Sequence, residues 1–169
     1  RYRYNSLNQL VWQKIPDHSL EDLFFYDGLG RLVASINGKQ RLISGGYHFS
    51  YTRYDGLGRI VEVGQTKLPI PAGSTYAAFL VSLRVKARDY KTWDTYVTGG
   101  TRTEITRTLY DIGGSTQKNL RGRVSSVTWM PDAATSTGPK TSQIAYSYDI
   151  HGNVATMVQY SFALDAKTV

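Results

Sequence analysis

Short runs of apolar and β-branched residues alternate with polar, glycine-containing steps along much of the chain. One such run covers residues 23–26, and a second covers residues 31–36 just beyond a polar step. Both runs are rich in residues that favour a pleated, half-buried strand surface. Two runs of this kind joined by a few turn-forming residues predict a β-hairpin. The pattern therefore predicts a mainly all-β protein that consists of an array of antiparallel β-hairpins.

One phrase of eight residues marks the predicted turns. Tyr26–Val33 reads Tyr-Asp-Gly-Leu-Gly-Arg-Leu-Val, and Tyr54–Val61 repeats it with Ile in place of the second Leu. Looser copies begin at Tyr4, Tyr110 and Tyr148. The phrase describes a strand that enters a tight turn and leaves as a second strand. Repeats of this kind usually act through the surface that they assemble rather than through one pocket.

The residue types of the phrase suit a turn. The Asp27 carboxylate is placed to accept hydrogen bonds from backbone N–H groups two residues on. Gly30 can adopt the positive φ that a type I turn followed by a bulge requires. Arg31 and Asp27 flank the turn, so they could pair within one hairpin or between neighbouring hairpins. An exposed pair contributes only about 0–1 kcal/mol, so we assign it to strand register rather than to stability.

The looser copies keep the turn chemistry with different residue types. Asn5 stands in place of the Asp, and Asn8 stands in place of the second Gly. Asn preserves both the turn hydrogen bonds and the left-handed backbone geometry. Asn153 stands where the perfect copies have Arg, and a polar stretch after Asp111 indicates a lengthened loop inside one hairpin. The predicted structural signature comprises Tyr26, Asp27, Gly28, Gly30, Arg31, Tyr54, Asp55, Gly56, Gly58, Arg59, Tyr110, Asp111, Gly122, Arg123, Tyr148, Asp149 and Gly152.

The spacing of the copies suggests an interrupted array. The steps from Tyr to Tyr are 22, 28, 56 and 38 residues, and the third is twice the second. We interpret the long step as a place where one repeat has been lost or overwritten. The expected organisation is therefore repeat hairpins over 1–64, an insertion or degenerate repeat over 65–108, and further hairpins over 109–169.

The expected insertion has two further patterns. Apolar residues at helical spacing over 76–83, preceded by Ser74, predict a short helix with Ser74 as its N-cap. Residues 83–89 then alternate, which predicts a strand whose one face carries Arg84, Lys86 and Arg88.

The repeated Tyr-Asp, Gly and Arg-Leu/Ile-Val pattern resembles the YD repeats of the bacterial Rhs family, which also occur in the C components of Tc toxins and in teneurins. The resemblance implies a β-sheet that spirals into a large hollow shell and encloses a toxic C-terminal segment. The implied partners are the rest of that shell and the enclosed effector, with secretion machinery or a surface glycan as further possibilities. It also implies a secreted or bacterial cell-surface location. One departure is that the Asp-Pro pair of the family's self-cleavage site is absent from the sequence.

An alternative function is adhesion, as in teneurins. In that case the Tyr-rich exterior, or the region 65–108, would contact a glycan or a protein partner. Because the chain opens inside a degenerate repeat and stops just after another repeat, we expect it to be a fragment of one larger shell domain. A slice of an open array has unpaired strand edges, so we expect the isolated chain to be poorly soluble or only marginally folded.

Composition limits which other classes of function the chain could have. The net charge of +7 would suit a nucleic-acid partner, but the basic residues are scattered and several belong to the repeat, so nucleic-acid binding is not expected. The chain has no Cys, which removes disulfides and thiolate metal sites. No apolar run is long enough to span a membrane.

The sequence contains no constellation that indicates an enzyme. His18, His48 and His151 are isolated and lack metal-ligand spacing. The Gly-Leu-Gly steps lack the third glycine and the following helix of a dinucleotide fingerprint. Each Asp-x-x-Gly step offers one carboxylate, whereas calcium sites require several oxygen ligands. We therefore expect a non-catalytic chain with no cofactor and no metal.

Overall fold

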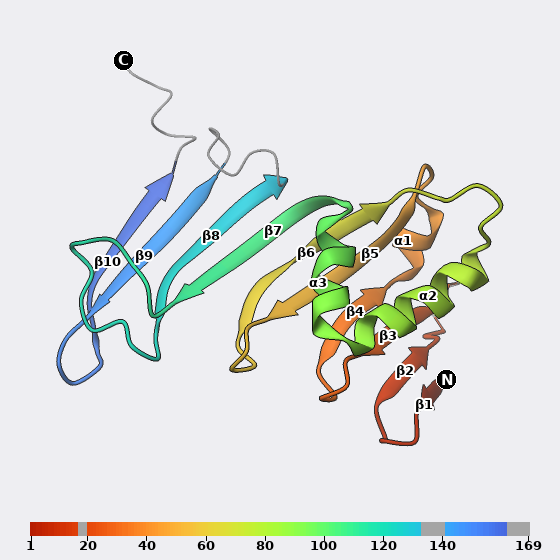
Figure 1. Cartoon of the computed structure of the whole chain (residues 1–169), viewed down its shortest axis with the longest axis horizontal. Coiled ribbons are helices and arrows are strands. Elements are labelled where there is room, and N and C mark those ends of the chain that lie inside the picture. Colours follow the sequence, from red (N-terminus) through yellow and green to blue (C-terminus); the bar gives the residue numbers. More distant parts are fainter. Residues whose placement is uncertain (17–19, 133–140, 162–169) are drawn as a thin grey trace, which may run out of the picture. The chain divides into compact units, whose positions relative to one another are not determined.

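A computed structural model describes residues 1–16, 20–132 and 141–161. Within these residues the protein is mainly β, with ten antiparallel strands in one open sheet and three helices (Figure 1). The strands are β1 (Tyr2–Tyr4), β2 (Leu10–Gln13), β3 (Asp22–Tyr26), β4 (Leu32–Ile36), β5 (Tyr47–Tyr54), β6 (Ile60–Leu68), β7 (Thr101–Tyr110), β8 (Val124–Asp132), β9 (Ser142–Tyr148) and β10 (Val154–Ser161). The expected array of antiparallel hairpins is confirmed.

The strands follow one another in the sheet in chain order, so two kinds of connection alternate. The five copies of the Tyr-Asp phrase each join an odd-numbered strand to the next even-numbered strand. The connections from an even-numbered strand to the next odd-numbered strand differ in length, and among the described residues two of these connections contain helices. The long step contains two helices, and the strands on either side of it, β6 and β7, are neighbours in the sheet.

The chain forms two compact units. The first contains residues 1–53 and 65–102, and the second contains residues 54–64 and 103–169. All three helices belong to the first unit. No described helix has the length and apolar character needed to cross a lipid bilayer.

Side chains cap the start of each helix. In α1 (Gly38–Leu42) the Asn37 side chain accepts from the Gln40 backbone N–H while the Gln40 side chain accepts from the Asn37 backbone, which is a capping box. Thr75 caps α2 (Tyr76–Arg88), and Asp89 caps α3 (Tyr90–Thr98). The predicted N-cap at Ser74 is therefore wrong by one residue.

The strand predicted over residues 83–89 is also wrong, because α2 continues to Arg88. Leu83 and Ala87 are fully buried, together with Phe79 one turn earlier, whereas Val85 is 63% exposed. Helical spacing therefore describes these residues, and the apparent alternation came from the basic residues among them. Their positive charges lie on a helix rather than on a strand face.

An aromatic cluster holds α2 and α3 against one face of the first unit's strands (Figure 1). Phe49 of β5 is fully buried, and its ring lies 6.0 Å from those of Phe79 and Trp93. The Tyr47 ring stacks on Phe79 at 4.1 Å. The Trp93 indole N–H donates to the Thr52 carbonyl at 3.0 Å, so its polar atom is satisfied. Each ring contributes about 1.5–3 kcal/mol by burial, so this cluster is the main core of the first unit.

The second unit has no helix among its described residues. Ile105 of β7 and Met130 of β8 are buried side by side, because they are paired in register. In contrast, β10 is exposed along nearly its whole length. The long loop between β7 and β8 bonds to β8 and β9, and it forms one wall of a groove that is described below.

Candidate functional site

The aspartate of each perfect repeat closes its own turn. The Asp27 carboxylate accepts from the backbone N–H groups of Leu29 and Arg31, both at 2.9 Å. Asp55 makes the same two bonds at the same distances in the next copy. Gly30 and Gly58 both have φ of 81°. The predicted turn bonding and left-handed glycine are therefore present in both copies.

The looser copies reach the same geometry with other residues. Asn5 accepts from the backbone N–H of Leu7, and Asn8 has φ of 58°. In the last copy the Asn153 side chain donates to Asp149 at 2.9 Å, in the place of the arginine bond. The fourth copy is a lengthened loop, as predicted, and its Asp111 accepts from the Gly122 backbone at 2.5 Å.

The arginines of the two perfect copies pair within their own hairpins, and Arg59 also pairs with the next turn. Arg31 donates to Asp27 at 2.7 Å, and Arg59 donates to Asp55 at the same distance. The Arg59 guanidinium also donates to Asp111 of the next turn at 2.7 Å. It lies 4.3 Å from the Tyr110 ring centre, in cation–π contact. Arg59 therefore connects two neighbouring turns, which agrees with a role in register.

These contacts lower the pKa of three turn carboxyl groups. Burial alone would raise the pKa of Asp55, but hydrogen bonds from Arg59 and Leu57 outweigh it and the net shift is downward. The Arg59 side chain lowers the pKa of Asp111, and the Asn153 side chain lowers that of Asp149. The carboxylates are therefore held ionised as hydrogen-bond acceptors, which is the opposite of what a general acid requires.

Three of the repeat tyrosines link their hairpin to the preceding one. The Tyr26 hydroxyl donates to the Leu10 carbonyl at 2.9 Å, and the Tyr148 hydroxyl donates to the Val124 carbonyl at 2.9 Å. The Tyr110 hydroxyl makes the equivalent bond to Ile60 at 3.1 Å. Each acceptor is the first residue of the strand that leaves the preceding turn. The same bond therefore recurs between successive hairpins in both units.

The first glycine of the phrase is Gly28 in one perfect copy and Gly56 in the other, and the two have different surroundings. The Gly28 N–H donates to the Arg88 carbonyl at the end of α2, and a Cβ atom on Gly28 would lie 3.3 Å from that oxygen. A Cβ atom on Gly56 would meet nothing within 4 Å. The first glycine is thus required for close approach to a helix only in the earlier copy.

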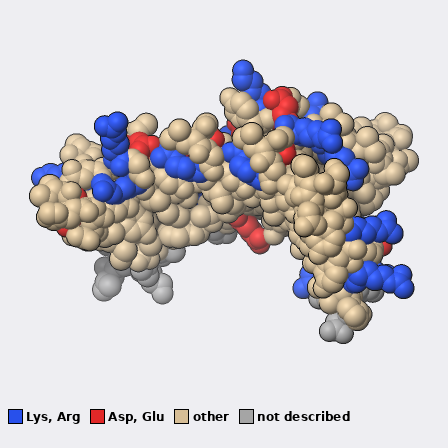
Figure 2. All heavy atoms as spheres, turned by 90° about the horizontal axis from the view of Figure 1, so that it is seen from below, with Lys and Arg blue, Asp and Glu red and all other residues tan. Residues whose placement is uncertain are grey.

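The histidines and the other candidate chemistry do not converge. His151 is exposed in the last turn, and His18 lies outside the described residues. His48 is half-buried in β5, its Nε2 has no hydrogen-bond partner, and burial and nearby Lys67 lower its pKa. No group of three potential metal ligands exists among the described residues. Figure 2 shows Asp and Glu side chains between several of the Lys and Arg side chains of the displayed face.

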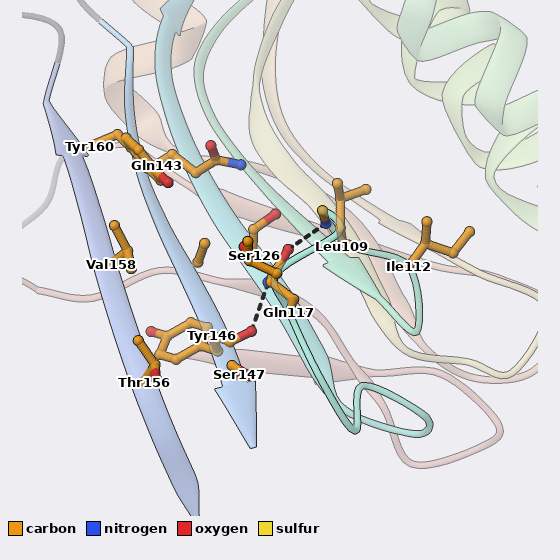
Figure 3. Close-up of a pocket in the computed structure, with 14 residues that line it drawn as sticks. Leu109, Ile112, Gln117, Ser126, Gln143, Tyr146, Ser147, Thr156, Val158 and Tyr160 are labelled. Carbon is orange, nitrogen blue, oxygen red and sulfur yellow. Dashed lines mark hydrogen bonds between the residues drawn. The ribbon is translucent and has the colours of Figure 1, made fainter. Parts of the chain in front are cut away.

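The second unit also contains a groove that the sequence did not indicate. Its cavity volume is about 700 Å³, and Figure 3 shows the side chains around it. The floor comes from one face of β7–β10 and one wall from the loop after Tyr110. The polar stretch in that loop was the only signal in the sequence, and it was interpreted as a longer turn. Pairing across four strands decides which side chains share the floor, so spacing within one strand could not reveal it.

No model of a known protein family matches this chain, and no curated protein matches it either.

Proposed function

We propose that this chain is a structural, non-catalytic segment of a YD-repeat shell like those of Rhs proteins, which holds a C-terminal toxin or effector apart from its surroundings. In this proposal the protein is bacterial and is secreted or displayed on the cell surface. Its partners are the remaining hairpins of the shell and the enclosed segment.

The observation that carries the proposal is the use of the repeat residues. In the perfect copies the aspartate closes the turn, and its arginine holds that aspartate. The tyrosine hydroxyls at positions 26, 110 and 148 bond to the preceding hairpin. A signature whose polar atoms are engaged in turn closure and lateral bonding favours the building of a wall. It leaves few of those atoms available to a substrate.

The open sheet supports the same proposal. Strands β1 and β10 stand at the ends of the strand order, and open edges of this kind readily pair with further strands. The lateral tyrosine bond occurs at three positions along the array, so further hairpins could repeat it. A shell of many hairpins needs such a repeatable bond, whereas a single binding domain does not.

The test is protease protection in the full-length protein that contains this chain. We expect the segment downstream of the repeats to be digested far more slowly in the intact protein than as a free peptide. Tyr148→Phe, which removes one lateral bond, should speed its digestion, while Tyr4→Phe should not, because the Tyr4 hydroxyl bonds to no described residue. Digestion of the downstream segment at the rate of the free peptide would refute the shell.

A further inference from the structure

A cavity of about 440 Å³ lies in the first unit, beside the two helices that follow β6. Its lining residues come from β5, from the end of β6 with the loop after it, from α2 and from α3, and all of them belong to this unit. None of them belongs to a copy of the Tyr-Asp phrase. The volume lies within the size range of small-molecule sites. The cavity is therefore a property of the helical region rather than of the repeat.

The aromatic walls of the cavity are preformed. The Tyr47 ring stacks on Phe79 at 4.1 Å, and the two residues are only 9% and 4% exposed. The Tyr96 ring lies 6.3 Å from the rings of Phe49 and Trp93, which are both buried in the main core of the unit. The packing that holds the helices on the sheet thus also fixes these rings. A ligand need not order them, which removes one cost of binding.

The polar groups of the cavity wall are neutral and paired with one another. The Tyr47 hydroxyl donates to the Ser74 hydroxyl at 3.3 Å, and the Ser82 side chain is hydrogen-bonded to that of Tyr96. Among the described residues that line the cavity, none carries a charge. A charged ligand would lose its hydration there without gaining a counter-charge, at a large cost in free energy. The cavity therefore favours a neutral ligand.

Three aromatic rings from three different elements line the cavity. They belong to Tyr47 of β5, Phe79 of α2 and Tyr96 of α3. Such rings pair with a further aromatic ring in tilted or offset-stacked arrangements, which raise affinity about two- to tenfold beyond the burial of area. A saturated ring of the same size buries a similar area but makes no such pair. The lining therefore favours an aromatic ligand over an aliphatic one.

A peptide segment fits the cavity less well. Its backbone N–H and C=O groups would need partners in place of the water that they lose. Pro69 and Pro71 line the cavity from the loop after β6, and proline has no backbone N–H to donate. The hydroxyls of the wall are already paired with one another. A peptide backbone would therefore leave several of its polar groups unsatisfied.

We propose that the cavity between Tyr47, Phe79 and Tyr96 binds a neutral aromatic small molecule of about two fused rings. A cavity of about 150 Å³ holds one benzene ring, so this larger cavity has room for a bicyclic ring with one small polar substituent. The ring contacts the three aromatic side chains. A hydroxyl oxygen accepts up to two hydrogen bonds, so that of Ser74, which accepts one from Tyr47, can accept another from the substituent.

The site does not depend on the shell proposal, because its residues lie outside the repeat phrase. The test uses the full-length protein that contains this chain and isothermal titration calorimetry with three probes of one ring skeleton. The probes are 2-naphthol, its saturated counterpart decahydro-2-naphthol, and the anion 2-naphthoate. We expect saturable binding of 2-naphthol, binding of the saturated alcohol that is weaker at least twofold, and binding of the anion that is weaker at least tenfold.

Two variants locate the site. Ala78 of α2 lines the cavity and is itself exposed, so Ala78→Trp fills the cavity without disturbing the core and should weaken 2-naphthol binding at least tenfold. Ala77→Trp is the matched control, because Ala77 is the adjacent exposed alanine of the same helix and does not line the cavity. Its affinity should match that of the unaltered protein. Ser82→Leu adds volume one turn further along α2 and should also weaken binding, with circular dichroism confirming the fold of each variant.

Three results would each overturn the proposal. The first is that 2-naphthol does not bind saturably. The second is that Ala78→Trp and Ser82→Leu, both folded, bind 2-naphthol as tightly as Ala77→Trp. The third is that the saturated alcohol or the anion binds as tightly as 2-naphthol.

Discussion

Removal of the Tyr148 hydroxyl isolates the lateral bond between hairpins. In Tyr148→Phe the ring keeps its place, and the Arg123 guanidinium 5.3 Å from the ring centre keeps its cation–π partner. Only the bond of 2.9 Å to the Val124 carbonyl is lost. Tyr26→Phe removes the equivalent bond, to Leu10, in the other unit.

The expected loss in the free energy of unfolding is about 1 kcal/mol for each variant. A typical intramolecular hydrogen bond contributes about 0.5–1.5 kcal/mol net, and a half-buried carbonyl that loses one donor keeps partial access to water. In a chain of this length such a loss lowers the midpoint of thermal unfolding by roughly 2–4 °C. The two variants lie in different units and share no contact, so their effects should add.

Urea unfolding, followed by far-UV circular dichroism and tryptophan fluorescence, measures these effects. Tyr4→Phe is the control, because Tyr4 occupies the same repeat position but its hydroxyl bonds to no described residue; its change should stay within about 0.5 kcal/mol. Equal effects for Tyr148→Phe and Tyr4→Phe would show that the lateral bond contributes nothing and would refute this reasoning.

Three further predictions concern the turns and the core. Gly56→Ala should leave the free energy of unfolding unchanged or raise it by up to about 1 kcal/mol. Gly28→Ala should unfold at a lower urea concentration than Gly56→Ala, because its Cβ approaches the Arg88 carbonyl. Phe49→Ala should destabilise the first unit by about 3–5 kcal/mol, seen in its fluorescence transition; a loss below that of the tyrosine variants would contradict the core assignment. Three turn carboxyls have lowered pKa values in the folded protein. Their contribution to the free energy of unfolding is therefore complete above about pH 4, and it is lost as the pH falls through these lowered pKa values. Urea midpoints measured from neutral to acidic pH should therefore fall less steeply in Asp149→Asn.

The turns could be predicted from the sequence because their chemistry is local. The Asp27 carboxylate bonds to backbone groups two and four residues away, and Gly30 needs only its own φ. The same holds for Asn5 and Asn8, where a different residue type performs the same task. A short window of sequence contains all of these partners, so the motif and its looser copies both reveal the hairpins.

Helix and strand could not be separated so well over residues 83–89. Basic residues at every second position mimicked a strand, whereas the structure buries Leu83 and Ala87 at helical spacing. Phe49 on a strand far earlier in the chain, together with Trp93 on α3, provides the core against which the helices pack. The local pattern left helical and strand periodicity both open for these residues, and tertiary packing decided for the helix.

Sequence alone thus determined where the chain turns and that it builds antiparallel hairpins, because each turn is closed by residues within a few positions of one another. Only the tertiary structure decided which carbonyl receives each tyrosine hydroxyl, that Arg59 reaches Asp111, and that Ser126, Gln143 and Thr156 share one groove. These contacts join residues on different strands, and strand order and register bring them together.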